Sequence, residues 1–365
     1  MSQTAEQKEQ FQGLRTPKET DQIFFTYSSP TRRKAAEECT PYHMDIELNN
    51  KCHGGCRFCF NSSHPGGTKF LPKEKLFQIM DEGYQLGARQ ILWNGGEPLL
   101  HPDFFEITEY AGEKGMKCAF FTSGISLNKK IAKRLVNTSN LQAIAINIDS
   151  FDPEVFNRLH TSPKLLEHKV RAVENLLDAG FPPSRLLPSI CITRLSAETV
   201  EETVDRFVDH YGAQMVYFFY FIPSGSGQKN AQWEPRLSQV RRACEYRAEK
   251  TSPHWLRIGS LDCNATHCRI KIYITYDGKV LPCNFLIHKP AGNIYEKSLI
   301  DIHEPNKESL HFKNIQIKGK CGSCEHNDQC FGCRGKAHWY LGDETASDPK
   351  CWLNPEAKEF YFADE

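Results

Sequence analysis

The stretch that decides the fold is Cys52-His53-Gly54-Gly55-Cys56-Arg57-Phe58-Cys59. It holds three cysteines, with three residues in the first gap and two in the second. Three thiolates on one short loop can hold three irons of a cubane iron–sulfur cluster, whose full protein ligation takes four, so one iron stays open to a small ligand. Gly54 and Gly55 lack a Cβ and let the backbone fold closely around a bulky group. A zinc loop that lacks one ligand, or three incidental thiols, would also fit this stretch.

The composition favours metal over disulfides. The 365 residues include 15 cysteines, and the polar start of the chain lacks the apolar core of a signal peptide, which indicates the cytoplasm. No run of about 18 apolar residues is present to span a bilayer. Lys+Arg and Asp+Glu both number 45, which gives no electrostatic case for a nucleic-acid or membrane partner. Four scattered cysteines are expected to be small core residues: Cys39, Cys118, Cys191 and Cys244.

On both sides of the loop, apolar strands alternate with segments of helical spacing. The expected strands are 43–49, 90–93, 118–122, 143–148, 187–193 and 215–222. The expected helices are 72–86, 103–114, 128–136, 165–179, 198–211 and 237–250. Six such units predict an α/β fold with a parallel sheet covered by helices, either a partial barrel or a doubly wound sheet. In both, ligands bind at the carboxyl ends of the strands.

A second motif, Asn94-Gly95-Gly96-Glu97-Pro98, follows the second expected strand. Two glycines permit an unusual turn close to a ligand, and the proline fixes it, although such a turn can also be purely structural. This motif and the cysteine loop, with the aromatic Phe58 before its last cysteine, resemble the radical S-adenosylmethionine (SAM) enzymes. The resemblance implies a partial (β/α)6 barrel. It also implies a 4Fe–4S cluster on Cys52, Cys56 and Cys59, and SAM contacts from Phe58, Gly95, Gly96, Glu97 and Pro98.

Two more strand ends resemble SAM contacts of the family. Thr122-Ser123-Gly124 stands where members often carry Thr-Asn-Gly, and Asn147-Ile148-Asp149-Ser150 where many carry Ser-Leu-Asp-Gly. The resemblance therefore suggests that Ser123, Asn147 and Asp149 contact the ribose or the carboxylate of SAM. Hydrogen-bonded turn residues would also explain them. His53, His64, His101 and His160 could meet an anionic substrate at the barrel mouth, or have surface and capping roles.

Eight cysteines gather in the last third of the chain. Asp277-Gly278 between two apolar runs predicts a hairpin that brings Cys268 and Cys283 together at its open end. The pattern resembles the SPASM extension of radical SAM enzymes, which binds two auxiliary 4Fe–4S clusters. By position the resemblance assigns one cluster to Cys263, Cys268, Cys283 and Cys333, and the other to Cys321, Cys324, Cys330 and Cys351. A pair of zinc ribbons is the alternative, since CxxC pairs hold zinc well.

The resemblance also divides the chain. It gives a polar arm with little pattern over 1–41, the barrel over 42–236, a linking helix over 237–254, the SPASM domain over 255–352 and a tail over 353–365. The two-residue gap between Cys330 and Cys333 resembles a subgroup with haem-pathway side-chain decarboxylases and some peptide maturases. Asn284 stands where sulfatase-maturing relatives carry an aspartate base. An amide cannot take a proton at neutral pH, so sulfatase maturation is not expected.

The activity that the resemblance implies is an anaerobic radical SAM oxidoreductase or maturase. SAM would be cleaved to a 5′-deoxyadenosyl radical that abstracts hydrogen from a carbon of a peptide or a small metabolite. The outcome would be dehydrogenation, decarboxylation or crosslinking, with a flavodoxin or ferredoxin as reducing partner. No residue of the chain stands out as a general acid or base. A non-catalytic iron–sulfur electron carrier is the rival, but a carrier has no need of the Gly-Gly-Glu-Pro turn.

Overall fold

One sheet of nine strands organises the molecule, which is a computed structural model that describes residues 29–259, 262 and 264–353. The strands are β1 (His43–Glu47), β2 (Gln90–Asn94), β3 (Lys117–Thr122), β4 (Leu141–Asn147), β5 (Leu186–Ile192), β6 (Tyr217–Tyr220), β7 (Lys271–Ile274), β8 (Lys279–Leu281) and β9 (Gly292–Asn293). Their order across the sheet is β6-β5-β4-β3-β2-β1-β7-β8-β9. From β1 to β6 each strand pairs in parallel with the next. These six parallel strands confirm the predicted partial barrel.

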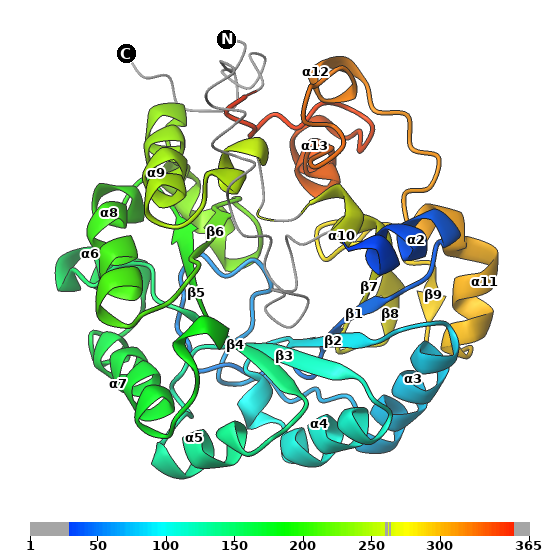
Figure 1. Cartoon of the computed structure of the whole chain (residues 1–365), viewed down its shortest axis with the longest axis horizontal. Helices are drawn as coiled ribbons and strands as arrows, with labels where there is room; N and C mark the ends of the chain where they lie inside the picture. Colours follow the sequence, from blue (N-terminus) through cyan, green and yellow to red (C-terminus); the bar gives the residue numbers. More distant parts are fainter. Residues whose placement is uncertain (1–28, 260–261, 263, 354–365) are drawn as a thin grey trace.

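Helices surround the outside of the curved sheet (Figure 1). The helices of the described residues are α2 (Pro30–Glu38), α3 (Lys73–Gln85), α4 (Phe104–Glu113), α5 (Lys129–Val136), α6 (Pro153–Leu159), α7 (Lys164–Asp178), α8 (Val200–Asp205), α9 (Leu237–Lys250), α10 (Ala265–Ile270), α11 (Leu299–Leu310), α12 (Gly319–Gly322) and α13 (Arg334–Leu341). Of these, α12 and α13 lie near the open side of the barrel rather than on the outer face of the sheet (Figure 1). Five of the helices, α3, α4, α5, α8 and α9, fall within the predicted helical segments, and α7 is shifted by one residue toward the N-terminus from the predicted 165–179. The predicted helix 198–211 differs, because α8 stops at Asp205 and a π-helical turn, η5 (Arg206–His210), completes it.

Six helices were not predicted: α10 to α13 belong to the extension, and the other two are α2 and α6. Part of the arm that was expected to show little pattern forms α2, which begins at the Ser29 cap and carries Pro30 in its first turn. Its buried residues are Arg32 and Ala35, so it shows no apolar stripe that periodicity could detect. The other, α6, starts at the Asp152 cap, whose side chain accepts from the backbone N–H groups of Glu154 and Val155. At seven residues it is too short for a clear helical period.

The two faces of the sheet carry two different cores. Ile144 and Ile146 of β4 belong to the large core beneath the helices, whereas their neighbours Ala143 and Ala145 belong to a smaller core inside the barrel. This alternation follows from the two-residue period of a strand. The inner core combines small side chains, such as Ala119 and Ala145, with the large rings of Tyr217 and Trp255.

The cysteine-rich extension continues the barrel sheet. β7 pairs in parallel with β1, with His43 opposite Lys271, and β8 returns antiparallel beside β7. The turn between β7 and β8 contains Gly278, whose φ of +88° favours glycine, so the predicted hairpin is confirmed. The extra pairing with β1 was not predicted. It fastens the extension to the strand that leads into the first cysteine loop, while the domain boundaries given above stay a prediction. Among the described helices, none is long and apolar enough to cross a membrane.

Candidate functional site

The first cysteine loop leaves the carboxyl end of β1 and wraps closely around its own sulfur atoms. The Gly54 N–H donates to Cys52 Sγ at 3.2 Å, and a Cβ on Gly54 would lie 3.2 Å from Cys52 Sγ and 3.7 Å from Cys56 Sγ. Gly55 adopts a φ of +61°, where a side chain would also meet Thr161. A side chain at Gly54 would crowd the thiols, whereas one at Gly55 would collide with Thr161 in a backbone conformation that favours glycine.

The raised pKa values of Cys52 and Cys56 are consistent with three cysteines that bind one metal cluster together. Burial raises the pKa of Cys52 to about 12, and the nearby Glu97 and Cys59 add to the rise. Burial also raises the pKa of Cys56. Such thiols become thiolates together when a metal binds them, because coordination deprotonates a thiol outright. Three cysteines on a glycine-containing loop, with no disulfide among the described cysteines, fit an iron–sulfur cluster with one open iron.

The backbone of the loop is fastened to the segment between α6 and α7. The Arg57 N–H donates to the Leu159 carbonyl at 2.9 Å, and the Thr161 N–H donates to the Gly55 carbonyl at 3.0 Å. The guanidinium Nε of Arg57 also donates to the carbonyl of His160 at 3.2 Å. These bonds hold the second and third cysteines against the barrel wall.

His160 lies fully buried beneath the loop rather than at an open barrel mouth. Its Nε2 lies 3.0 Å from Asp149 Oδ2, and its Nδ1 lies 3.3 Å from the Gly54 carbonyl oxygen. Its ring stacks on Phe156 at 4.0 Å and meets Phe58 edge-on at 5.6 Å. Burial lowers the pKa of His160, and the hydrogen bond to Asp149 opposes this shift. His160 therefore positions the cysteine loop and the carboxylate together.

The Gly-Gly-Glu-Pro turn packs directly on the start of the cysteine loop. The Gly96 N–H donates to the Asn49 carbonyl and the Glu97 N–H to the Lys51 carbonyl, both at 2.7 Å. Gly95 has a φ of +119°, and a Cβ on Gly96 would lie 2.1 Å from the Lys51 carbonyl oxygen. Only glycine fits both positions. Pro98 is buried and opens a short 3-10 turn.

The Glu97 carboxylate joins this turn to the end of β3. Its Oε2 accepts from the Ser123 backbone N–H at 2.7 Å and from the Ser123 hydroxyl at 2.5 Å. Its Oε1 accepts from the Thr122 hydroxyl at 2.8 Å and from the Leu99 N–H at 3.2 Å. Four donors thus fix a carboxylate that is 1% exposed. Ser123 thus lies beside the Gly-Gly-Glu-Pro turn, and its contact with SAM stays a prediction.

The end of β4 brings Asn147 and Asp149 to the same edge. Asn147 Nδ2 donates to Asp149 Oδ1 at 2.8 Å, and the Cys191 N–H donates to the same oxygen at 2.8 Å. Asp149 is fully buried and its oxygens serve the protein's own donors.

Lys169 on α7 is a site residue that the sequence analysis missed. Its Nζ donates to the Asn147 carbonyl at 2.7 Å, and the lysine is 1% exposed. Among residues 29–259, 262 and 264–353, no carboxylate forms an ion pair with this ammonium. The signal was present, because Lys169 lies at helical spacing between the apolar Leu165 and Val173 on the buried face of α7.

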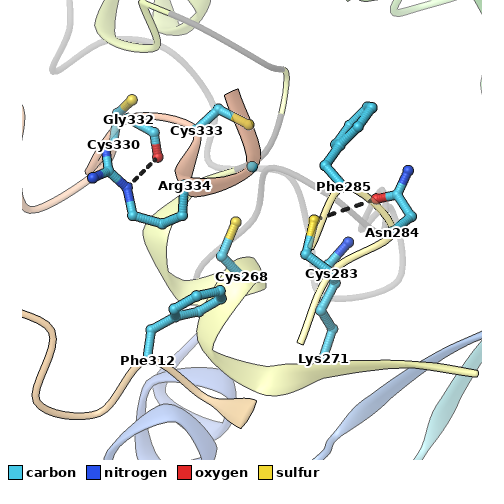
Figure 2. Close-up of a pocket in the computed structure, with 11 residues that line it drawn as sticks. Cys268, Lys271, Cys283, Asn284, Phe285, Phe312, Cys330, Gly332, Cys333 and Arg334 are labelled. Atoms are coloured by element: carbon cyan, nitrogen blue, oxygen red, sulfur yellow. Dashed lines mark hydrogen bonds between the residues drawn. The ribbon is translucent and has the colours of Figure 1, made fainter. Parts of the chain in front are cut away.

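Figure 2 shows a hollow in the extension with the sulfur atoms of Cys268, Cys283 and Cys333 turned toward it and that of Cys330 turned away. Burial raises the pKa of Cys268 and of Cys333 to about 12 in each case. Lys271 and Arg334 also line the hollow, so positive charge faces the thiols. These features fit a negatively charged thiolate cluster. The fourth expected ligand, Cys263, lies outside the described residues.

Three cysteines of the second expected group, Cys321, Cys330 and Cys351, lie near Asp348. The Asp348 N–H donates to Cys321 Sγ at 3.3 Å. Burial raises the pKa of Cys351 well above its usual range, and the nearby Asp348, Cys330 and Cys321 raise it further. Cys324 accepts from the His326 N–H at 3.5 Å. Cys330 thus neighbours both groups, and its assignment to the second cluster stays a prediction.

Comparison with known proteins identifies the class. Residues 46–207 match the family model of the radical SAM superfamily, and residues 263–334 match the SPASM model, an iron–sulfur cluster-binding domain. The chain belongs to the radical SAM superfamily, in the group that carries a SPASM extension. It is an enzyme of this superfamily, and the two domains imply 4Fe–4S clusters.

Particular relatives span nearly the same length. The AdoMet-dependent heme synthase of Methanosarcina barkeri is 27% identical over 346 residues, which cover 86% of this chain and 96% of that protein. The mycofactocin maturase MftC of Mycobacterium ulcerans is 28% identical over 333 residues, which cover 85% and 88%. The crystal structure of Streptococcus suis SuiB bound to S-adenosylmethionine has the same fold, with a TM-score of 0.67 and 18% identity over 86% of this chain and 77% of that one.

Proposed function

We propose that this enzyme binds SAM at the edge where β1 to β4 end, and that it oxidatively modifies a peptide. The observation that carries the proposal is the joint placement of the cysteine loop, the Gly-Gly-Glu-Pro turn and Ser123 by direct hydrogen bonds. When bound, a 4Fe–4S cluster and SAM would supply a 5′-deoxyadenosyl radical that abstracts hydrogen from the substrate. The protein's own task is to position the substrate carbon and exclude water.

The site residues divide by chemistry. Cys52, Cys56 and Cys59 would hold the cluster, and the turn at 95–98 would take the amino group of SAM. Ser123 and Asn147 would contact the ribose or the carboxylate of SAM, whereas Asp149, whose oxygens accept from the protein's own donors, would position Asn147. Lys169 adds a buried ammonium beside Asn147, and a buried charge is costly unless a partner neutralises it. A carboxylate of SAM is a partner of the required sign.

The extension would hold two auxiliary clusters, one on Cys263, Cys268, Cys283 and Cys333, the other on Cys321, Cys324, Cys330 and Cys351. The hollow beside Lys271 and Arg334 supports the first of them. Such clusters suit reactions in which the substrate must give up an electron. Asn284 lines the same hollow and cannot act as a base, so proton removal from the substrate would need another group.

A peptide substrate is supported by the maturase relatives. A second candidate, a carboxylate-bearing small metabolite, is favoured by the heme synthase relative, which this chain covers almost completely. Formation of 5′-deoxyadenosine above the substrate-free rate distinguishes them under anaerobic conditions with dithionite. Stimulation by peptides supports the first candidate. Stimulation by a propionate-bearing haem precursor, and by no peptide, would replace it with the second.

Cysteine variants test the division of labour. Cys56→Ala should abolish SAM cleavage and leave about eight irons per chain, whereas Cys268→Ala should keep SAM cleavage and lose substrate turnover. Cys118→Ala is the matched control, because Cys118 is a fully buried core thiol of β3 and should keep about twelve irons. SAM cleavage by Cys56→Ala protein would overturn the assignment of the SAM site. Unchanged turnover by Cys268→Ala protein would overturn the auxiliary role.

A further inference from the structure

Two histidines and a glutamate meet on the surface of the extension, and none of them is a predicted cluster ligand. His288 follows β8, His338 lies on α13, and Glu344 follows that helix. One ligand atom from each of the three lies within 4.8 Å of the others. None of these residues has a part in the SAM site or in the auxiliary clusters proposed above.

The contacts of this trio leave metal-binding atoms facing one another. The two imidazole rings stack with centroids 3.6 Å apart and planes within 10°. Nδ1 of His338 is buried and makes no hydrogen bond within the described part of the chain. It lies 3.8 Å from Glu344 Oε2. A buried ring nitrogen usually has a hydrogen-bond partner, and a bound metal ion would explain why this nitrogen has none.

We propose that His288, His338 and Glu344 form a binding site for a divalent transition ion, with Zn²⁺ as the expected occupant. Two imidazoles and one carboxylate are a common zinc donor set, and water would complete a tetrahedral shell. Imidazole donors disfavour Mg²⁺ and Ca²⁺, which prefer oxygen. Because the two rings stack nearly parallel, they would have to unstack for their nitrogens to converge on one ion at ligand distances of about 2.0–2.2 Å.

Lys289 partly neutralises the Glu344 carboxylate of this site. Its ammonium pairs with Oε1 of Glu344 and so competes with a cation for the same carboxylate. Removal of the Lys289 charge is therefore expected to strengthen metal binding, which a purely structural contact among these side chains would not do.

Bound zinc would clamp three segments that carry expected cluster ligands. His288 comes five residues after Cys283, His338 five after Cys333, and Glu344 seven before Cys351. The ion would hold these segments together independently of the iron–sulfur clusters. It would act as a structural clip on the extension rather than as a redox centre, because zinc is not redox-active.

The test is zinc binding to the full-length, iron-replete protein. After mild chelation, the protein is dialysed against Zn²⁺ with a competing chelator, and zinc and iron are counted in the same sample. The wild type should bind about one zinc ion per chain with its iron unchanged. His288→Gln and His338→Gln should each weaken zinc binding at least about tenfold, because loss of a residue that only hydrogen-bonds to a metal ligand already costs that much affinity. Lys289→Gln should tighten it.

His168→Gln is the matched control, because His168 is exposed on α7, outside the extension. It should bind zinc as the wild type does. Equal zinc affinity in the wild type and in the iron-replete His338→Gln protein would mean an adventitious ion only, and would overturn the proposal. Zinc uptake that releases an equivalent amount of iron would overturn it as well, because the ion would then occupy cluster cysteines.

Discussion

Glu97→Gln tests how the Gly-Gly-Glu-Pro turn is held at the end of β3. Glutamine keeps the shape of the side chain but replaces one accepting oxygen by an NH₂ group that can only donate. Each oxygen of Glu97 now accepts from one backbone N–H, that of Leu99 or that of Ser123. Whichever way the amide turns, one of these buried N–H groups loses its acceptor.

The expected loss of SAM affinity follows from the one N–H group that loses its acceptor. A buried donor without an acceptor costs about 1–3 kcal/mol. If SAM binding has to restore the original turn, the same free energy corresponds to a Kd about 5- to 150-fold weaker. Loss of the buried negative charge acts in the same direction, because the amino group of SAM is positive.

Equilibrium dialysis of SAM against anaerobic, iron-replete protein measures the effect, with iron counted in the same sample. Glu106→Gln is the control, since Glu106 is a surface residue paired with Lys73, and it should change stability by less than about 0.5 kcal/mol. An unchanged SAM Kd in the Glu97→Gln protein would refute the reasoning, because the four hydrogen bonds of Glu97 would then have no part in SAM binding.

Three further predictions follow from single contacts. Gly96→Ala should abolish SAM binding but keep the iron, because its Cβ would lie 2.1 Å from the Lys51 carbonyl oxygen; isothermal titration with normal affinity would contradict this. Asp262→Ala leaves the buried guanidinium of Arg247 without its carboxylate and should lower the free energy of unfolding by about 3–5 kcal/mol in denaturant titrations; an unshifted midpoint would argue against it. Burial lowers the pKa of His311 from 6.5 to about 3, so protonation favours the unfolded state. The free energy of unfolding should therefore fall from pH 6.5 toward pH 3 by up to about 1.4 kcal/mol per pH unit. In the His311→Asn protein it should fall less steeply. Equal pH slopes in the two proteins would contradict the lowered pKa of His311.

The sequence was a good guide wherever a pattern repeats or a motif has a fixed spacing. The strand–helix alternation predicted β1 to β6, and the Asp277-Gly278 turn predicted the hairpin of β7 and β8. The strand–helix alternation alone did not distinguish a partial barrel from a doubly wound sheet, and the cysteine loop favoured the barrel. Loop and turn proved adjacent in space because both follow the carboxyl ends of neighbouring parallel strands.

Contacts between distant segments could not be read from the sequence. The parallel pairing of β7 with β1 joins residues more than 200 positions apart, and no local signal announces it. The role of His160 depends on Asp149 and on the Gly54 carbonyl, which only the folded chain brings together. Lys169 did leave a signal, a charge on the buried face of α7, but its partner at the end of β4 was not visible.

The central claim is that one chain binds three 4Fe–4S clusters and cleaves SAM. The direct measurement is an iron and sulfide count on anaerobically reconstituted protein, followed by assay of 5′-deoxyadenosine with dithionite and SAM. We expect about twelve irons per chain and formation of 5′-deoxyadenosine. About four irons with zinc in the remaining thiol sites would make the extension structural. Absence of 5′-deoxyadenosine under any reductant would contradict the account.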